Sequence, residues 1–127
     1  MKKKSSEKYD YKIIEALKRL PPHIEDKRHG FVIEVKDDRS RSNETRFQHI
    51  AKKAHLLKVR DIEAISEGVK DYIRFSKSMS LKDTYYYYIR RGGNDKGFIQ
   101  LAIKLIEGEK KKYYIKTIFI AYRINNC

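Results

Sequence analysis

The last third of the chain carries three segments with the residue pattern of β-strands, separated by residues typical of turns. The strand-like segments, residues 85–91, 98–106 and 112–124, are rich in aromatic and β-branched side chains. Residues 92–95 and 107–109 between them contain glycine beside polar residues, as tight turns do. Because such short turns join neighbouring strands, the sequence predicts an antiparallel β-meander over residues 81–127.

The preceding region, residues 9–80, has mainly helical spacing. Apolar residues lie on one face of a helix over residues 11–20, which Pro21 and Pro22 end because proline cannot continue a helix. A short strand is predicted for residues 31–36.

Two more helices are predicted after a polar loop. Asn43 can cap the first helix. Its apolar stripe comprises Phe47, Ile50, Ala51, Ala54 and Leu57. The second helix begins at Arg60, and its inward residues are Ile62, Ile65, Val69, Tyr72 and Ile73. The expected fold class is α+β, with N-terminal helices packed on the C-terminal meander in one domain, residues 1–127, after a basic mobile tail at residues 1–8.

The chain is strongly basic, with 30 Lys and Arg against 17 Asp and Glu among 127 residues and a net charge of +13. The meander region is the most basic, with 10 basic and 4 acidic residues over 81–127. This balance favours a polyanionic partner such as RNA. The single cysteine, Cys127, excludes a disulfide framework within the chain. No signal peptide or membrane-spanning segment is found, which predicts a cytoplasmic protein.

The two faces of the predicted sheet differ in character. On the middle strand the alternating residues Ile99, Leu101, Ile103 and Leu105 form an aliphatic face. On the last strand Ile115, Thr117, Phe119, Ala121 and Arg123 are expected to share the opposite face. Gln100, Lys104, Thr117 and Arg123 would then lie on a basic surface with aromatic rings, which suits single-stranded nucleic acid. An ordinary solvated face is the alternative.

Two histidines lie on the helix predicted after the loop. His55 falls at the edge of the apolar stripe near Lys52, where an imidazole can bind phosphate or transfer a proton. His49 lies about 120° away on an ideal helix, so the two are not expected to act as a tightly coupled pair. A structural or solvated role for each is the alternative. Their spacing is not that of a helical metal pair, and Glu44 is expected on a solvated face, so neither a metal site nor a carboxylate base is predicted.

The segment from Phe47 to His55, FQHIAKKAH, resembles a signature of the phage-type barnase-like nucleases, which belong to the barnase, EndoU, colicin and RelE fold class. In that signature a histidine and an isoleucine precede a basic residue and a second histidine, which here are His49, Ile50, Lys52 and His55. Residues 117–119 resemble the Thr-x-aromatic motif of the family's last strand. The proline that ends the family's second helix is missing here.

The resemblance implies a metal-independent endoribonuclease without cofactors, either a toxin or a nuclease of a phage or mobile element. It implies cleavage of RNA, including tRNA or other structured RNA, by the 2′-hydroxyl, and an acidic immunity or antitoxin protein as a further partner. The implied acid/base is His55, with His49 as the alternative, while Thr117 would donate a hydroxyl and Arg123 would bind phosphate. The predicted nucleic-acid contacts are Lys52, Lys53, Arg90, Lys104 and Gln100. A non-catalytic module that binds RNA or DNA is the alternative function. Convergence of His55, Thr117 and Arg123 on one cleft would favour the nuclease, whereas side chains that point to opposite sides of the sheet would favour the binding module.

Overall fold

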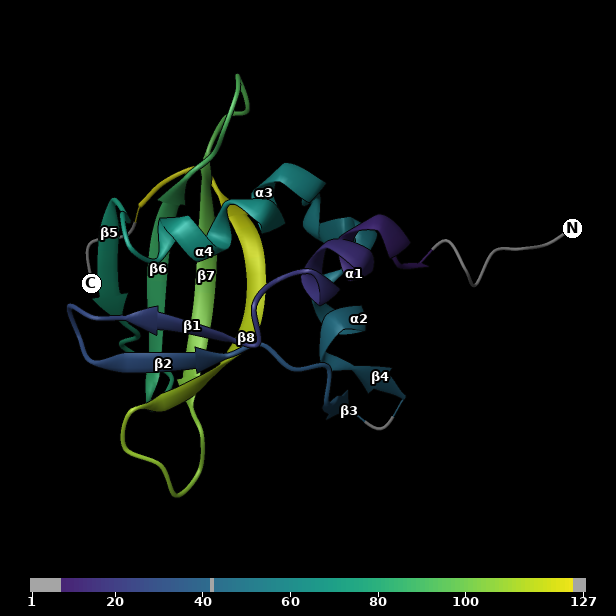
Figure 1. Ribbon diagram of the computed structural model, residues 1–127. Coiled ribbons are helices and arrows are strands. Elements are labelled where there is room, and N and C mark those ends of the chain that lie inside the picture. The colour runs from purple at the N-terminus through teal and green to yellow at the C-terminus, as the bar shows by residue number, and fades with distance from the viewer. Residues whose placement is uncertain (1–7, 42, 125–127) are drawn as a thin grey trace, which may run out of the picture.

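A computed structural model describes residues 8–41 and 43–124 of the chain (Figure 1). The predicted basic tail therefore lies, except for Lys8, outside the described residues, as does Cys127. The helices are α1 (Tyr11–Lys18), α2 (Arg46–Ile50), the 3₁₀-helix η2 (Lys53–His55), α3 (Val59–Glu63) and α4 (Ile65–Gly68). The strands are β1 (His23–Asp26), β2 (Phe31–Glu34), β3 (Arg39–Arg41), β4 (Glu44–Thr45), β5 (Arg74–Lys77), β6 (Thr84–Arg90), β7 (Phe98–Leu105) and β8 (Lys112–Ala121).

Six of these strands form one mixed sheet in the order β1-β2-β8-β7-β6-β5. The predicted antiparallel meander is confirmed as β6, β7 and β8. The predicted order of helices first and strands afterwards is wrong, because β1 and β2 precede most of the helices and β2 joins β8 in parallel. The fold is therefore α+β, with a sheet assembled from both halves of the chain.

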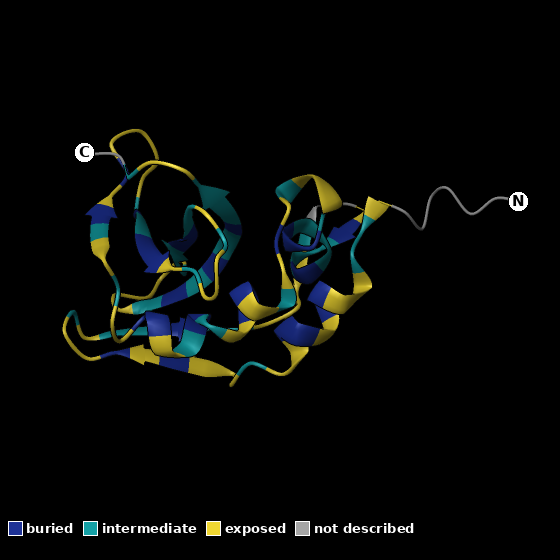
Figure 2. Cartoon of the chain, turned by 90° about the horizontal axis from the view of Figure 1, so that it is seen from above, coloured by how far each residue is buried: buried dark blue, intermediate teal, exposed yellow. Residues whose placement is uncertain are grey.

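The sheet is strongly curled, and the β1–β2 hairpin crosses in front of β6, β7 and β8 (Figure 1). The hairpin packs on the inner face of the sheet, where the His29 ring stacks on Phe75 of β5 with the ring centroids 4.0 Å apart. Buried and exposed residues alternate along the ribbons (Figure 2). The predicted aliphatic face of β7 is confirmed, since Ile99, Leu101 and Ile103 are completely buried.

A β-bulge in β8 changes which of its residues face the core. Ala102 pairs with Thr117 and Ile103 pairs with Ile115, so Lys116 lies between two consecutive pairs without a partner of its own. Ile115 is consequently buried in the same core as Ile118. The prediction that Ile115 shares a face with Thr117 is wrong, because strict alternation fails across a bulge.

The helix predicted from the apolar stripe between Phe47 and Leu57 is much shorter than that stripe indicated. The helix α2 begins at Arg46 and ends at Ile50, and its N-cap is Thr45 rather than Asn43. Thr45 and Gln48 form a reciprocal capping box, which satisfies amides at the start of the helix. The stripe residue Ala54 is exposed.

The helix predicted to begin at Arg60 is divided into α3 and α4 at Ala64. Ile73, predicted to face inward, lies beyond both helices and is 40% exposed. Among the described residues, no helix has the length and apolar character needed to cross a membrane.

Gly68 of α4 packs tightly against the sheet. A Cβ atom at this position would overlap the Ile89 side chain of β6. We expect Gly68→Ala to lower the free energy of unfolding by about 1–3 kcal/mol, since overpacking a well-packed core costs that much. Urea unfolding measures the change. The matched control is Gly92→Ala, whose new methyl would have Arg60 Cδ as its nearest neighbour at 3.9 Å. Equal stability of the two variants would contradict this tight packing.

Candidate active site

A buried carboxylate organises a group of polar side chains beside the sheet. Glu44 of β4 is only 7% exposed. Its Oε2 accepts a hydrogen bond from the Tyr9 hydroxyl at 2.9 Å and lies 3.4 Å from the Lys52 ammonium. Its Oε1 lies 3.4 Å from Nδ1 of His49. We call Tyr9, Glu44, His49, Lys52 and His55 the Glu44 cluster.

The early end of α2 brings the two histidines of this cluster together. After Ile50 the backbone becomes extended at Lys52, which forms an isolated β-bridge with Tyr9. The short helix η2 then returns His55 toward His49, so that their ring centroids lie 5.9 Å apart and the rings meet edge-on at 82°. The expectation that His49 and His55 lie about 120° apart on one helix is therefore wrong, because α2 ends at Ile50.

A backbone contact determines which nitrogen of His55 exchanges protons. Nδ1 of His55 lies 2.9 Å from the carbonyl oxygen of Ile50. Because a carbonyl oxygen can only accept a hydrogen bond, Nδ1 holds its proton in both charge states of the ring. Nε2 is therefore the nitrogen of His55 that gains and loses a proton, as a catalytic acid or base requires.

His49 has a different environment. Burial lowers the pKa of the His49 imidazole, and the positive charges of Lys52 and His55 lower it further, while Glu44 opposes the shift. His49 Nδ1 and Glu44 Oε1 are both buried, and their separation of 3.4 Å forms no hydrogen bond. His49 is thus held as a neutral imidazole at neutral pH, which is the form that accepts a proton.

Glu44 remains ionised in this setting. Burial alone would raise the pKa of the Glu44 carboxyl group, but the hydrogen bond from Tyr9 and the charge of Lys52 outweigh it and lower the pKa. The prediction that Glu44 lies on a solvated face is wrong, because the residue belongs to a strand and not to a helix. The pattern Thr45-x-x-Gln48 was the sequence signal that could have shown this, since a capping box places Glu44 before the helix.

The lowered pKa of His49 predicts a pH dependence of stability. The unfolded chain binds a proton at His49 near pH 6.5, whereas the native state resists it, so the native state loses stability as the pH falls below about 6.5. We expect the free energy of unfolding, measured in urea at pH 7, 6 and 5, to decrease through this window. The decrease should be smaller in His49→Asn. The exposed His23→Asn serves as the control and should keep the full dependence, and an unchanged slope in His49→Asn would contradict the assignment.

The helices α2 and η2 lie against β8, the strand that carries Thr117. Arg46 of α2 places its guanidinium over the Tyr114 ring, 4.4 Å from the centroid, and its Nε donates to Oδ1 of Asp38 at 3.1 Å. Neither Arg46 nor Tyr114 was predicted as a site residue from the sequence. The helices that carry His49 and His55 are thus neighbours of the strand that carries Thr117.

The strand register separates the two predicted arginines from Thr117. Arg90 pairs with Phe98, which in turn pairs with Ala121 at the end of β8. Ala121 is four residues from Thr117, roughly 13 Å along a strand, and Arg123 lies beyond it. Arg123 therefore lies away from Thr117, so the convergence of His55, Thr117 and Arg123 on one cleft is not found. Both arginines are exposed and stay predicted nucleic-acid contacts outside the Glu44 cluster.

The sheet face opposite the aliphatic face of β7 is less exposed to solvent than predicted. Gln100 is 8% exposed, and its neighbours Tyr88 and Ala102 are almost completely buried. The contact of Gln100 with nucleic acid stays a prediction, although its burial leaves little of the amide exposed. Lys104 is partly exposed across from Tyr114, and Lys53 is exposed in η2, so both stay predicted contacts.

The Glu44 cluster offers a basic residue, a buried carboxylate and two imidazoles within one short stretch of structure. Among the described residues, no group of three or more His, Cys, Asp and Glu side chains is arranged to hold a metal ion. No protein-family model, curated protein or solved structure matches this chain. The chemistry of the site is therefore inferred from its own residues.

Proposed function

We propose that this protein is an endoribonuclease that cleaves RNA without a metal ion, in the manner of the phage-type barnase-like nucleases. The observation that carries the proposal is the pair of imidazoles of His49 and His55, whose ring centroids lie 5.9 Å apart beside buried Glu44. Cleavage by the 2′-hydroxyl needs a group that accepts a proton and another that donates one. Two adjacent histidines in different environments supply the proton acceptor and the proton donor.

In the proposed reaction the 2′-oxygen of the RNA bonds to the adjacent phosphorus while the bond from phosphorus to the 5′-oxygen breaks. Neutral His49 accepts the proton of the 2′-hydroxyl. Protonated His55 delivers a proton from Nε2 to the departing 5′-oxygen. The products are a 2′,3′-cyclic phosphate and a 5′-hydroxyl, and exchange of protons with water returns both histidines to their starting states.

The remaining residues of the site have supporting roles in this proposal. Lys52 and Lys53 offset the negative charge that develops on the phosphate, and Thr117 donates its hydroxyl to a phosphate oxygen. Glu44 is a positioning residue, since it contacts both His49 and Lys52 from a buried position. The excess of basic residues draws RNA to the protein, and the same surface would attract an acidic immunity or antitoxin protein.

The first test is incubation of the purified protein with total RNA in EDTA, followed by electrophoresis and by analysis of the fragment ends. We expect fragments that end in a 2′,3′-cyclic phosphate. RNA that stays intact at equimolar protein would contradict the proposal. Binding measured in parallel at two salt concentrations would then identify a non-catalytic module, whose affinity falls steeply with salt because bound counterions are released.

A further inference from the structure

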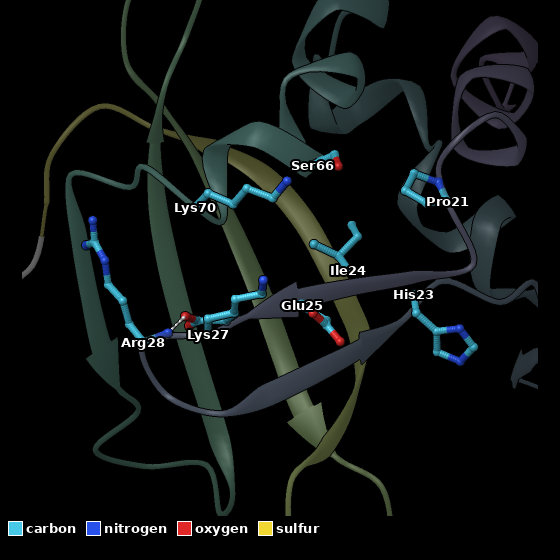
Figure 3. Close-up of a pocket in the computed structure, with 9 residues that line it drawn as sticks. Pro21, His23, Ile24, Glu25, Lys27, Arg28, Ser66 and Lys70 are labelled. Atoms are coloured by element: carbon cyan, nitrogen blue, oxygen red, sulfur yellow. Dashed lines mark hydrogen bonds between the residues drawn. The ribbon is translucent and has the colours of Figure 1, made fainter.

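A cavity of about 650 Å³ opens between strand β1 and helix α4, and it shares no residue with the Glu44 cluster (Figure 3). Its volume lies in the range of roughly 300–1,000 Å³ that is usual for small-molecule sites. Ile24 and Pro21 supply its apolar lining, and Ser66 supplies a hydroxyl group. The cavity therefore has the size and the mixed lining of a ligand site.

Two lysines line this cavity from opposite sides. Lys27 comes from the turn after β1, and Lys70 comes from the residues that follow α4, whereas the side chain of the neighbouring Arg28 extends away from both lysines (Figure 3). The Arg28 guanidinium is held over the ring of Tyr72, 5.1 Å from the centroid. Lys70 lies 3.8 Å from Glu67, but both side chains are largely exposed, so this pair is weak and leaves the ammonium available.

The two acidic residues of the lining do not cancel these charges. Asp26 is 2% exposed, and its carboxylate accepts hydrogen bonds from the Tyr87 hydroxyl at 2.5 Å and the Arg28 amide at 3.0 Å. His29 Nδ1 lies 2.7 Å from the same carboxylate. Glu25 points to the opposite side of β1 from Ile24, as His23 does (Figure 3). Asp26 is thus engaged by buried partners and Glu25 is directed away, which leaves the exposed ammonium groups of Lys27 and Lys70 at the opening of the cavity.

We propose that this cavity binds a phosphate ester through Lys27 and Lys70, with Ser66 as a hydrogen-bond donor and Ile24 against the apolar part of the ligand. Ammonium groups and a hydroxyl are suited to phosphate oxygens. The shared chemistry belongs to a free nucleotide and to the 5′-phosphate of an RNA chain. The proposal stands whether or not the Glu44 cluster cleaves RNA.

The test is isothermal titration of the full chain with ADP, with a 5′-phosphorylated RNA hexamer and with the same hexamer lacking the phosphate. The probe variant is Lys27→Gln/Lys70→Gln. The matched control is Lys12→Gln/Lys18→Gln, which removes the same charge from exposed positions on α1. We expect the probe variant to bind the phosphate ester about tenfold more weakly than the control, because two charge-assisted contacts are lost.

The three ligands distinguish the two sources of phosphate. If the probe variant loses affinity for ADP alone, the ligand is a free nucleotide. If it loses affinity for the phosphorylated hexamer alone, the ligand is the 5′ end of an RNA chain. Equal affinities of probe and control variants for every ligand, or no measurable binding of ADP and no benefit from the 5′-phosphate, would overturn the proposal. Both hexamers are 2′-O-methylated, which removes the attacking hydroxyl, so binding is measured without cleavage at the Glu44 cluster.

Discussion

His55→Asn is expected to lower the rate of RNA cleavage by about 10²–10⁴-fold, the usual contribution of a positioned acid or base. The asparagine amide can still donate to the Ile50 carbonyl oxygen, as Nδ1 of His55 does at 2.9 Å. It cannot transfer a proton at neutral pH. The variant should therefore remain folded while losing the proton that the proposed mechanism delivers to the 5′-oxygen. Single-turnover cleavage of a labelled RNA measures the loss.

The matched control for this experiment is His23→Asn, an exposed histidine on β1 outside the Glu44 cluster. It should cleave RNA at the rate of the natural sequence. Urea unfolding of both variants separates a catalytic loss from a loss of structure. If His55→Asn cleaves RNA at a rate within a factor of about three of the control, the loss is smaller than an ordinary acid/base contribution. His55 would then have no catalytic role in the proposed mechanism.

Asp61→Ala is expected to lower the free energy of unfolding by about 3–5 kcal/mol, the cost of removing one partner of a buried ion pair. Asp61 is completely buried, and its two oxygens accept hydrogen bonds from Nε and an Nη atom of Arg91 at 3.0 and 2.9 Å. Asp61 also accepts from the amide of Lys58 at the start of α3. Without Asp61, the buried guanidinium of Arg91 loses its main carboxylate partner. The amide of Lys58 at the start of α3 also loses its hydrogen-bond acceptor.

Asp71→Ala is the matched control for Asp61→Ala, since Asp71 is exposed on the surface after α4. Its substitution should change the free energy of unfolding by no more than about 0.5 kcal/mol. Both changes are read from urea unfolding at pH 7. Equal losses in the two variants would show that the Asp61–Arg91 pair does not connect α3 to the β6–β7 hairpin as the structure indicates.

Local patterns predicted the parts of the fold that depend on neighbouring residues. The meander followed from strand segments joined by turns, and α1 followed from apolar spacing that ends before Pro21. The parallel pairing of β2 with β8 was not predictable in this way, because nothing in residues 31–34 indicates a partner about 80 residues later. The bulge at Lys116 was also hidden, since the alternation on each side of it is regular.

The candidate site was predicted in part. The signature around His49 and His55 identified both imidazoles, and their adjacency came only from the break after Ile50. Glu44 was rejected because helical glutamates are usually solvated, an argument that does not hold for a strand residue. Tyr9 reaches Glu44 across 35 residues of sequence. Such long-range contacts depend on tertiary packing, which no local pattern contains.

The most direct test of the proposed mechanism is cleavage of a defined RNA that lacks one 2′-hydroxyl. A cut site is first mapped on a short RNA, and the nucleotide on its 5′ side is then replaced by its 2′-deoxy form. We expect cleavage at this site to disappear in EDTA while other sites are cut at unchanged rates. Continued cleavage at the 2′-deoxy position would contradict attack by the 2′-hydroxyl and with it the proposed roles of His49 and His55.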